Sequence, residues 1–182
     1  MVEGSSLAPL MAPLGERLRN ENLTVAVAES CTGGLLAATL TDLPGASDVF
    51  VGGAITYTYE AKERILGIPR SLLEEKGAVS GEVAVEMARR VREQLGADLG
   101  LSVTGVAGPN SQEGKPVGLV YVAAAAAGRT EVRELQLRGG RASNRLAAVE
   151  QAVGLGLKLL GDRNGGEHET EARAAEAARS ST

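Results

Sequence analysis

Ser30 stands where an apolar segment gives way to Cys-Thr-Gly-Gly, after which apolar residues return with helical spacing. A strand that turns into a helix in this way brings unpaired backbone N–H groups together, and glycines let a ligand approach the main chain. A hydroxyl at that point can act as a nucleophile. Thr32, Gly33 and Gly34 are therefore predicted to contact a substrate. The alternative is that Ser30 or Thr32 only caps the helix, which both residue types do well.

Lys62 is a second candidate, because it lies in the first turn of a helix predicted over about residues 60–66. The helix dipole disfavours a cation there, and burial would lower the basicity of the amine further, as a general base near neutral pH requires. Tyr57 and Tyr59 precede this lysine and would share one face if the preceding strand continued through them. The alternative is a solvated surface lysine that follows an acidic residue, Glu60.

Two further segments place small or basic residues at the ends of predicted elements. Thr104, Gly105 and Gly108 follow a strand but lack the glycine spacing of a dinucleotide-binding loop and the Lys-Ser/Thr of a P-loop. They form either a tight turn or a wall of the ligand crevice found at strand ends in α/β sheets. Arg141 and Arg145 open the last long helix, where they are either a solvated basic helix start or an anchor for phosphate.

Length and composition indicate one domain over residues 1–160, followed by a polar tail over 161–182 that is expected to be disordered. The formal net charge is −4 and there is no Trp, so nucleic acid is not an expected partner. No apolar segment is long enough to span a bilayer, and the first residues do not resemble a signal peptide. We therefore expect a cytoplasmic protein without a membrane partner.

Histidine and cysteine usage narrows the possible chemistry. The one histidine, His168, lies in the polar tail, so a Ser-His-Asp or Cys-His catalyst is not expected. A catalytic base would be Lys, Tyr, Asp, Glu or a polarised water. The one cysteine, Cys31, excludes an internal disulfide framework and a Cys-rich metal site. Neither a metal nor a cofactor is expected.

Hydrophobic periodicity predicts an α/β fold in the form of a three-layer sandwich, with helices on both faces of a mixed sheet. The last three strands are too close in sequence for crossover helices, so antiparallel neighbours are expected there. Gly154 and Gly156, inside the last helix, indicate close packing. The expected strands cover residues 23–28, 49–57, 99–104, 117–125 and 131–137; the expected helices cover a segment within the first twenty residues and about 34–41, 60–66, 81–95 and 141–160.

Five motifs, taken in order, carry a resemblance to a known family. They are Glu29-Ser-Cys-Thr-Gly-Gly34, the segment 57–62, Gly77-Ala-Val-Ser80, the segment 104–109 and Lys115-Pro-Val-Gly118. The set resembles the CinA C-terminal domain family over roughly residues 7–160 and is far more specific than any one motif. That family contains bacterial nicotinamide-nucleotide amidohydrolases. The resemblance implies a stand-alone deamidase domain that hydrolyses nicotinamide mononucleotide (NMN) to nicotinic acid mononucleotide and ammonia.

The resemblance also implies roles for individual residues. Ser30 matches the family nucleophile, and Tyr57 and Lys62 match its partners. Lys62 would take the proton of Ser30, Tyr57 would relay it or orient the groups, and backbone N–H groups between Thr32 and Gly34 would hold the oxyanion. Cys31 is the rival nucleophile, because thiols are intrinsically better nucleophiles.

The expected partners are the nucleotide substrate and a second copy of the chain. Thr104, Gly105 and Gly108 would line the nucleotide pocket, and Arg141 or Arg145 would bind the phosphate. A homodimer or higher homo-oligomer is the expected assembly.

The sequence departs from the usual family pattern at three places. Thr58 and Tyr59 replace Ser-Asn, residues 110–114 replace a glycine-rich loop, and Gly140 stands where the family has an acidic residue. These changes favour a second hypothesis, a catalytically weak nucleotide-binding or regulatory module. The presence of Ser30 and Lys62 with Tyr57 favours the enzyme.

Overall fold

One five-stranded sheet forms the centre of the protein. The structure, a computed structural model, describes residues 8–161, so most of the predicted tail, including His168, lies outside the described residues. The sheet order is β2-β1-β3-β4-β5, with β1, β2 and β3 parallel and β4 and β5 antiparallel to their neighbours. The strands are β1 (Val25–Glu29), β2 (Phe50–Ile55), β3 (Leu99–Gly105), β4 (Leu119–Ala126) and β5 (Arg129–Gln136).

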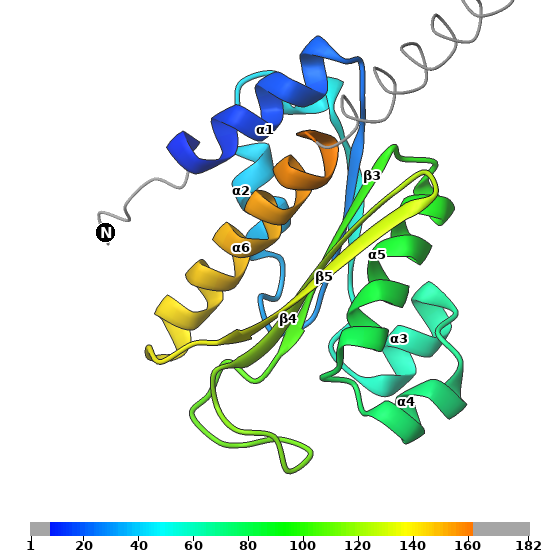
Figure 1. Cartoon of the computed structure of the whole chain (residues 1–182), viewed down its shortest axis with the longest axis vertical. Helices are drawn as coiled ribbons and strands as arrows, with labels where there is room; N and C mark the ends of the chain where they lie inside the picture. Colours follow the sequence, from blue (N-terminus) through cyan, green and yellow to red (C-terminus); the bar gives the residue numbers. More distant parts are fainter. Residues whose placement is uncertain (1–7, 162–182) are drawn as a thin grey trace, which may run out of the picture.

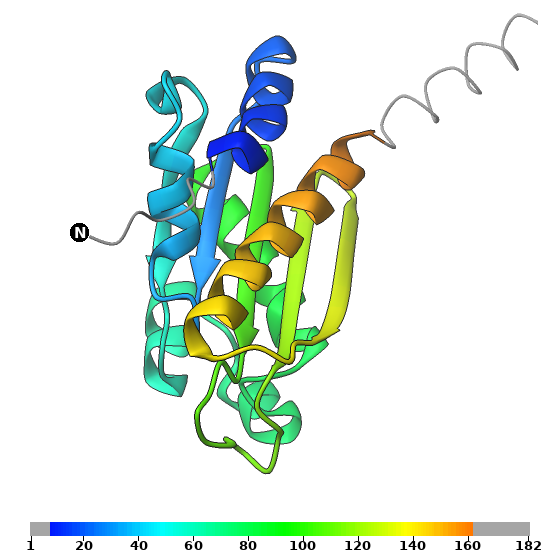
Figure 2. The same cartoon turned by 90° about the vertical axis from the view of Figure 1, so that its left-hand side faces the viewer.

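Helices cover both faces of this sheet, which confirms the predicted three-layer α/β sandwich (Figures 1 and 2). One face carries α1 (Ala8–Asn20), α2 (Leu35–Thr41) and α6 (Arg141–Gly161). The other carries α3 (Tyr59–Leu66), α4 (Arg70–Lys76) and α5 (Gly81–Leu95), and a short 3-10 turn, Ala46–Asp48, precedes β2. Parallel strands need crossover connections, whereas the two residues between β4 and β5 suit a hairpin.

The sheet brings together segments that are distant in sequence. Strands β1 and β3 are adjacent and buried along their whole length, and both end at the same edge. Strand β2 ends there as well, and β4 begins there because it runs antiparallel. The residues that follow these strands, Ser30, Thr56 and Val106, are therefore neighbours at one edge, where ligand crevices of α/β sheets occur.

Two local predictions differ from the structure. Strand β2 ends at Ile55, two residues earlier than expected, because the Thr58 side chain accepts a hydrogen bond from the backbone N–H of Ala61 and begins α3. Tyr57 and Tyr59 therefore do not share a strand face. Helix α4, of seven residues, was not predicted.

The two glycines of α6 have different surroundings. Gly156 is buried, and a Cβ at this position would lie 2.9 Å from Cδ2 of Leu101 on β3. Gly154 is exposed, and a Cβ there would meet no atom within 4 Å. Close packing, predicted for both, therefore holds for Gly156 alone.

This difference can be measured with two alanine variants. Gly154→Ala should raise the free energy of unfolding by about 0.5–1 kcal/mol, because alanine is the better helix former and nothing obstructs its methyl group. Gly156→Ala should lower it by about 1 kcal/mol, because the methyl group would displace the fully buried Leu101. Urea unfolding of both variants checks the pair. Equal stabilisation by both would show that α6 does not pack closely against β3.

Candidate active site

Glu29 organises the turn that carries Ser30. Its carboxylate, 1% exposed, accepts hydrogen bonds from the backbone N–H groups of Gly34 (3.0 Å), Leu36 (3.1 Å) and Ala37 (2.8 Å). The start of α2 at Leu35 is thus capped by an acidic side chain six residues before it, where the helix dipole favours negative charge. Sequence reasoning missed this role; the only signal was an acid directly before the turn. The alternative that Ser30 or Thr32 caps the helix is wrong.

Ser30 and Lys62 are in direct contact. The Nζ atom of Lys62 lies 3.1 Å from Oγ of Ser30 and donates a second hydrogen bond, of 2.7 Å, to the carbonyl oxygen of Thr56. Lys62 is fully buried and Ser30 is 8% exposed. The alternative of a solvated surface lysine is therefore wrong.

Burial changes the acid–base chemistry of this pair. Desolvation lowers the pKa of Lys62 from 10.5 to about 8, although the nearby Cys31 and Glu113 act in the opposite direction. A substantial neutral fraction is then present near physiological pH, and a neutral amine can accept the proton of the Ser30 hydroxyl. The pair has the geometry and the basicity of a nucleophile with its general base.

Cys31 has the opposite character. Burial raises the pKa of its thiol to about 11, despite the positive charges of Lys62, Arg145 and Arg141 nearby. Since the thiolate is the reactive form, a thiol with this pKa is a poor nucleophile at neutral pH. Of the two neighbours, Ser30 is the better placed to react.

Ser30 lies in a small pocket at the carboxyl ends of the parallel strands. The predicted residues that line it with Ser30 are Tyr57, Thr104, Gly105, Gly108 and Arg141; Cys31, Ala78, Val79, Val106, Ala107, Asn110 and Gln112 complete it. Its free volume is about 50 Å³, less than a nicotinamide ring would need. A substrate of that size would have to displace residues at the rim, of which Tyr57, at 54% exposed, is the most accessible apolar one.

Thr32, Gly33 and Gly34 are outside the pocket lining, and two of their backbone N–H groups have partners. The Gly33 N–H donates to the carbonyl oxygen of Ser30 (3.0 Å), and the Gly34 N–H donates to Glu29. The predicted oxyanion role is therefore wrong for these two glycines. Within residues 8–161 no backbone carbonyl accepts from the N–H groups of Cys31 and Thr32, the two residues that follow the nucleophile. The Cys31 N–H is directed at the sulfur of its own side chain.

The two arginines of α6 are used differently. Arg145 donates from Nε and Nη2 to the carbonyl oxygen of Thr32 and so holds the Ser30 turn against α6. Arg141 lines the pocket and donates to the carbonyl oxygen of Gly108 (2.7 Å) and to the hydroxyl of Tyr57 (3.2 Å). The Tyr57 hydroxyl thus contacts an arginine, rather than Lys62 as the relay hypothesis requires.

Two buried polar side chains support the other wall of the pocket. The hydroxyl of Thr104 donates to the carbonyl oxygen of Ala78 (2.7 Å). Asn144, 1% exposed, donates to the carbonyl oxygen of Ala107 (3.2 Å) and accepts from the N–H of Gly139 (2.9 Å). One signal could have identified Asn144: it is a polar residue among the apolar positions of a helix.

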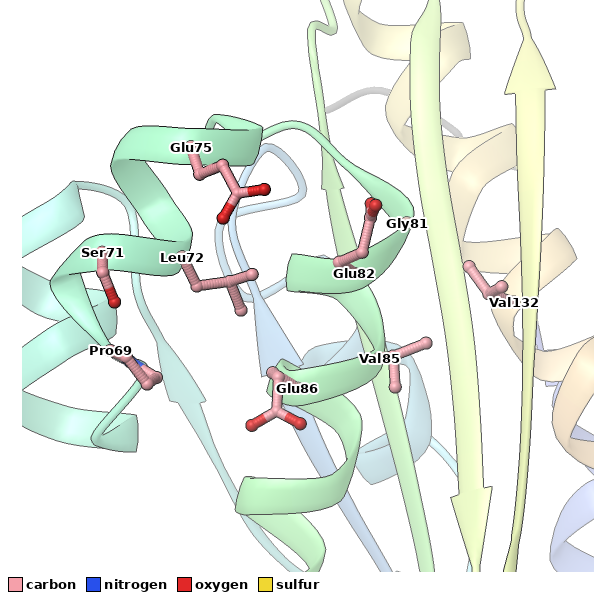
Figure 3. A pocket seen from close by; sticks show the side chains of 9 residues that line it. All are labelled: Pro69, Ser71, Leu72, Glu75, Gly81, Glu82, Val85, Glu86 and Val132. Carbon is pink, nitrogen blue, oxygen red and sulfur yellow. The ribbon is translucent and has the colours of Figure 1, made fainter.

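A larger hollow, of about 690 Å³, lies away from Ser30 between α4, α5 and β5 (Figure 3). Leu72, Val85 and Val132 point into it, and Glu75, Glu82 and Glu86 stand around it. These carboxylates form ion pairs with Lys76, Arg89 and Arg90. The one hydroxyl side chain in its lining, Ser71, has no hydrogen bond to a base within the described residues, so the size of the hollow does not make it the stronger catalytic candidate.

The described part of the chain has neither a cluster of metal-ligating side chains nor a membrane-spanning helix. Within residues 8–161, no three His, Cys, Asp or Glu side chains cluster as metal ligands would. In the same residues, no helix is both long and apolar enough to cross a membrane.

Known proteins resemble this chain in sequence and in fold. Residues 7–160 match the model of the CinA C-terminal domain, and the chain therefore belongs to that family. A CinA-like protein of Desulfovibrio desulfuricans is 50% identical over 157 residues, which are 84% of this chain and 37% of that protein. Another, from Syntrophomonas wolfei, is 46% identical over 158 residues, 86% of this chain and 38% of that protein. The chain thus spans little more than a third of these curated relatives.

Solved structures of similar proteins agree in fold. The competence/damage inducible protein CihA of Agrobacterium tumefaciens is 35% identical, with a TM-score of 0.82 over 88% of this chain and 99% of that one. A CinA superfamily protein of Escherichia coli is 32% identical, with a TM-score of 0.82 over 87% of this chain and 93% of that one.

The buried lysine should make stability depend on pH. Because the pKa of Lys62 falls from 10.5 to about 8 on folding, the unfolded state binds more protons between these pH values, and stability rises with pH across that window by about 3 kcal/mol. Lys62→Met removes the ionisable group. The unfolding free energy of this variant minus that of the wild type should therefore fall by about 3 kcal/mol from pH 8 to 10.5, measured by urea unfolding.

Ser30→Ala, which keeps the lysine, serves as the control and should retain the wild-type dependence. The difference in unfolding free energy between Lys62→Met and the wild type could instead stay constant from pH 8 to 10.5. That result would show that Lys62 is not desolvated.

Proposed function

We propose that this protein is a serine amidohydrolase that converts NMN to nicotinic acid mononucleotide and ammonia. The observation that carries the proposal is the buried contact of 3.1 Å between Nζ of Lys62 and Oγ of Ser30, a residue that lines a pocket. Membership of the CinA C-terminal domain family and the motif resemblance support NMN as the substrate.

Acylation begins when Oγ of Ser30 attacks the carbon of the nicotinamide carboxamide while neutral Lys62 takes the hydroxyl proton. The carbonyl oxygen becomes an oxyanion. The N–H groups of Cys31 and Thr32 follow the nucleophile directly and are the donors we assign to it. The carbon–nitrogen bond then breaks, and the leaving amide nitrogen receives the proton from Lys62 and departs as ammonia.

Deacylation uses the same base. A water molecule attacks the ester on Ser30 while Lys62 accepts a proton from it. The bond between the carbonyl carbon and Oγ breaks, and the proton returns to Oγ. Nicotinic acid mononucleotide leaves after its new carboxylic acid gives its remaining proton to solvent. One water is consumed and one ammonia is released per cycle, and no redox step or metal is required.

Arg141 and Arg145 are the candidates for the phosphate of NMN, and Thr104, Gly105 and Gly108 for the walls around the nucleotide. The carbonyl oxygen of Thr56 keeps Nζ of Lys62 directed toward Ser30. The exposed rim of the pocket has to open for the ring to enter, because the free volume is only about 50 Å³.

The nucleophile assignment is tested by ammonia release from NMN with purified protein. Ser30→Ala should abolish turnover and still fold and bind NMN, because Glu29, not Ser30, caps α2. Cys31→Ala should keep activity within a few-fold, because its thiol is protonated at neutral pH.

A Ser30→Ala variant with substantial activity, together with an inactive Cys31→Ala, would move the nucleophile to Cys31. If the wild type binds NMN but releases no ammonia, the nucleotide-binding module becomes the better description.

The base is tested by the pH dependence of kcat/KM. In the wild type kcat/KM should rise about tenfold per pH unit and level off above about pH 8, as Lys62 loses its proton. Lys62→Arg keeps the charge but cannot lose its proton at accessible pH, so turnover should fall by about 10²- to 10⁴-fold.

Binding of NMN to this variant, followed by calorimetry, should persist. An active Lys62→Arg enzyme with the wild-type pH profile would show that Lys62 supplies charge rather than proton transfer.

A further inference from the structure

The two arginines at the start of α6 differ in how much of each guanidinium is available to a ligand. Arg145 is half-buried and directs Nε and Nη2 to one carbonyl oxygen, that of Thr32. It does not line the Ser30 pocket. Its hydrogen bonds join α6 to the turn that carries the nucleophile, across 113 residues of sequence. Such a group fixes a backbone position and has little freedom to follow a substrate.

Arg141 has the opposite placement. It is exposed and lines the pocket, and within residues 8–161 it makes two hydrogen bonds, one from each terminal nitrogen. A guanidinium has five N–H donors, so about three remain for a ligand. Paired donors of this kind match the oxygen atoms of a phosphate.

The pocket is lined by both buried and exposed polar side chains. Ser30 lines the pocket, is buried and contacts the buried Lys62, whereas Arg141 and Tyr57 line the same pocket and are exposed. An elongated substrate with an amide at one end and an anionic group at the other fits this order. The amide would reach the nucleophile, and the anion would stay at the solvent edge, where its desolvation costs least.

We propose that Arg141 is the specificity-determining residue that binds the phosphate of the substrate, and that Arg145 is a positioning residue for the Ser30 turn. The inference rests on the proposed hydrolysis of NMN and assigns the phosphate to one of its two candidates. It makes the enzyme selective for the nucleotide over nicotinamide riboside, which has the same amide but no phosphate.

The Tyr57 hydroxyl is one of the two groups that Arg141 contacts in the pocket. Arg141 holds both Tyr57 and the carbonyl oxygen of Gly108, which line the same pocket. A phosphate can bind through the N–H donors of Arg141 that remain, so these two contacts persist when it is bound.

The experiment compares kcat/KM for NMN and for nicotinamide riboside in three glutamine variants. Arg141→Gln should lower the ratio of the two values by about 10- to 100-fold, mainly by raising KM for NMN, because a charge-assisted contact is lost. Arg145→Gln should lower kcat for both substrates alike and keep the ratio. Arg138→Gln, an exposed arginine three residues earlier that does not line the pocket, is the matched control and should keep both rates.

An unchanged ratio in Arg141→Gln, or a collapsed ratio in Arg145→Gln, overturns the assignment. Calorimetry in the Ser30→Ala background separates this inference from the proposed function. NMN that binds at least tenfold more tightly than the riboside, with an advantage that Arg141→Gln removes, supports the phosphate site even if the wild type releases no ammonia. Equal affinity for the two ligands overturns it even if the enzyme is active.

Discussion

The burial of one amine determines most of what this site can do. Lys62 has no exposed surface, and its Nζ atom has two acceptors, a serine hydroxyl and a backbone carbonyl oxygen. Neither acceptor is a carboxylate that would stabilise the protonated form, so desolvation dominates and lowers the pKa. The same burial that destabilises a charged lysine raises the neutral fraction of the amine near neutral pH, which the proposed reaction requires of its base. Stability and reactivity are thus coupled at a single atom.

The surrounding strands and helices hold the amine of Lys62 next to the hydroxyl of Ser30. Ser30 follows the buried strand β1, and Thr56 follows β2, its neighbour in the sheet, so the sheet ladder sets the separation of the two acceptors. Glu29 fixes the turn from one side through α2, and Arg145 fixes it from the other through α6. A site held by strand ends and helix ends is more rigid than one carried on a long loop.

The relatives set this domain in a wider context. Similar sequences occur as little more than a third of longer CinA-like proteins, whereas the similar solved structures are nearly matched along their whole length. The pocket described above is built entirely from residues between 30 and 141, within the matched range of 7–160. The proposed roles of Ser30 and Lys62 can therefore be tested on this chain.

The sequence by itself determined the fold class, most helices and strands, and the candidates Ser30 and Lys62, because these follow from local periodicity and from motifs at strand ends. It did not determine where β2 ends, that α4 exists, or that Glu29 caps α2. It also left open whether Lys62 is buried and which arginine faces the pocket. Those features depend on which segments become neighbours when the sheet forms. Burial, pKa and the partner of each guanidinium are properties of that assembled environment, and no single segment of sequence contains them.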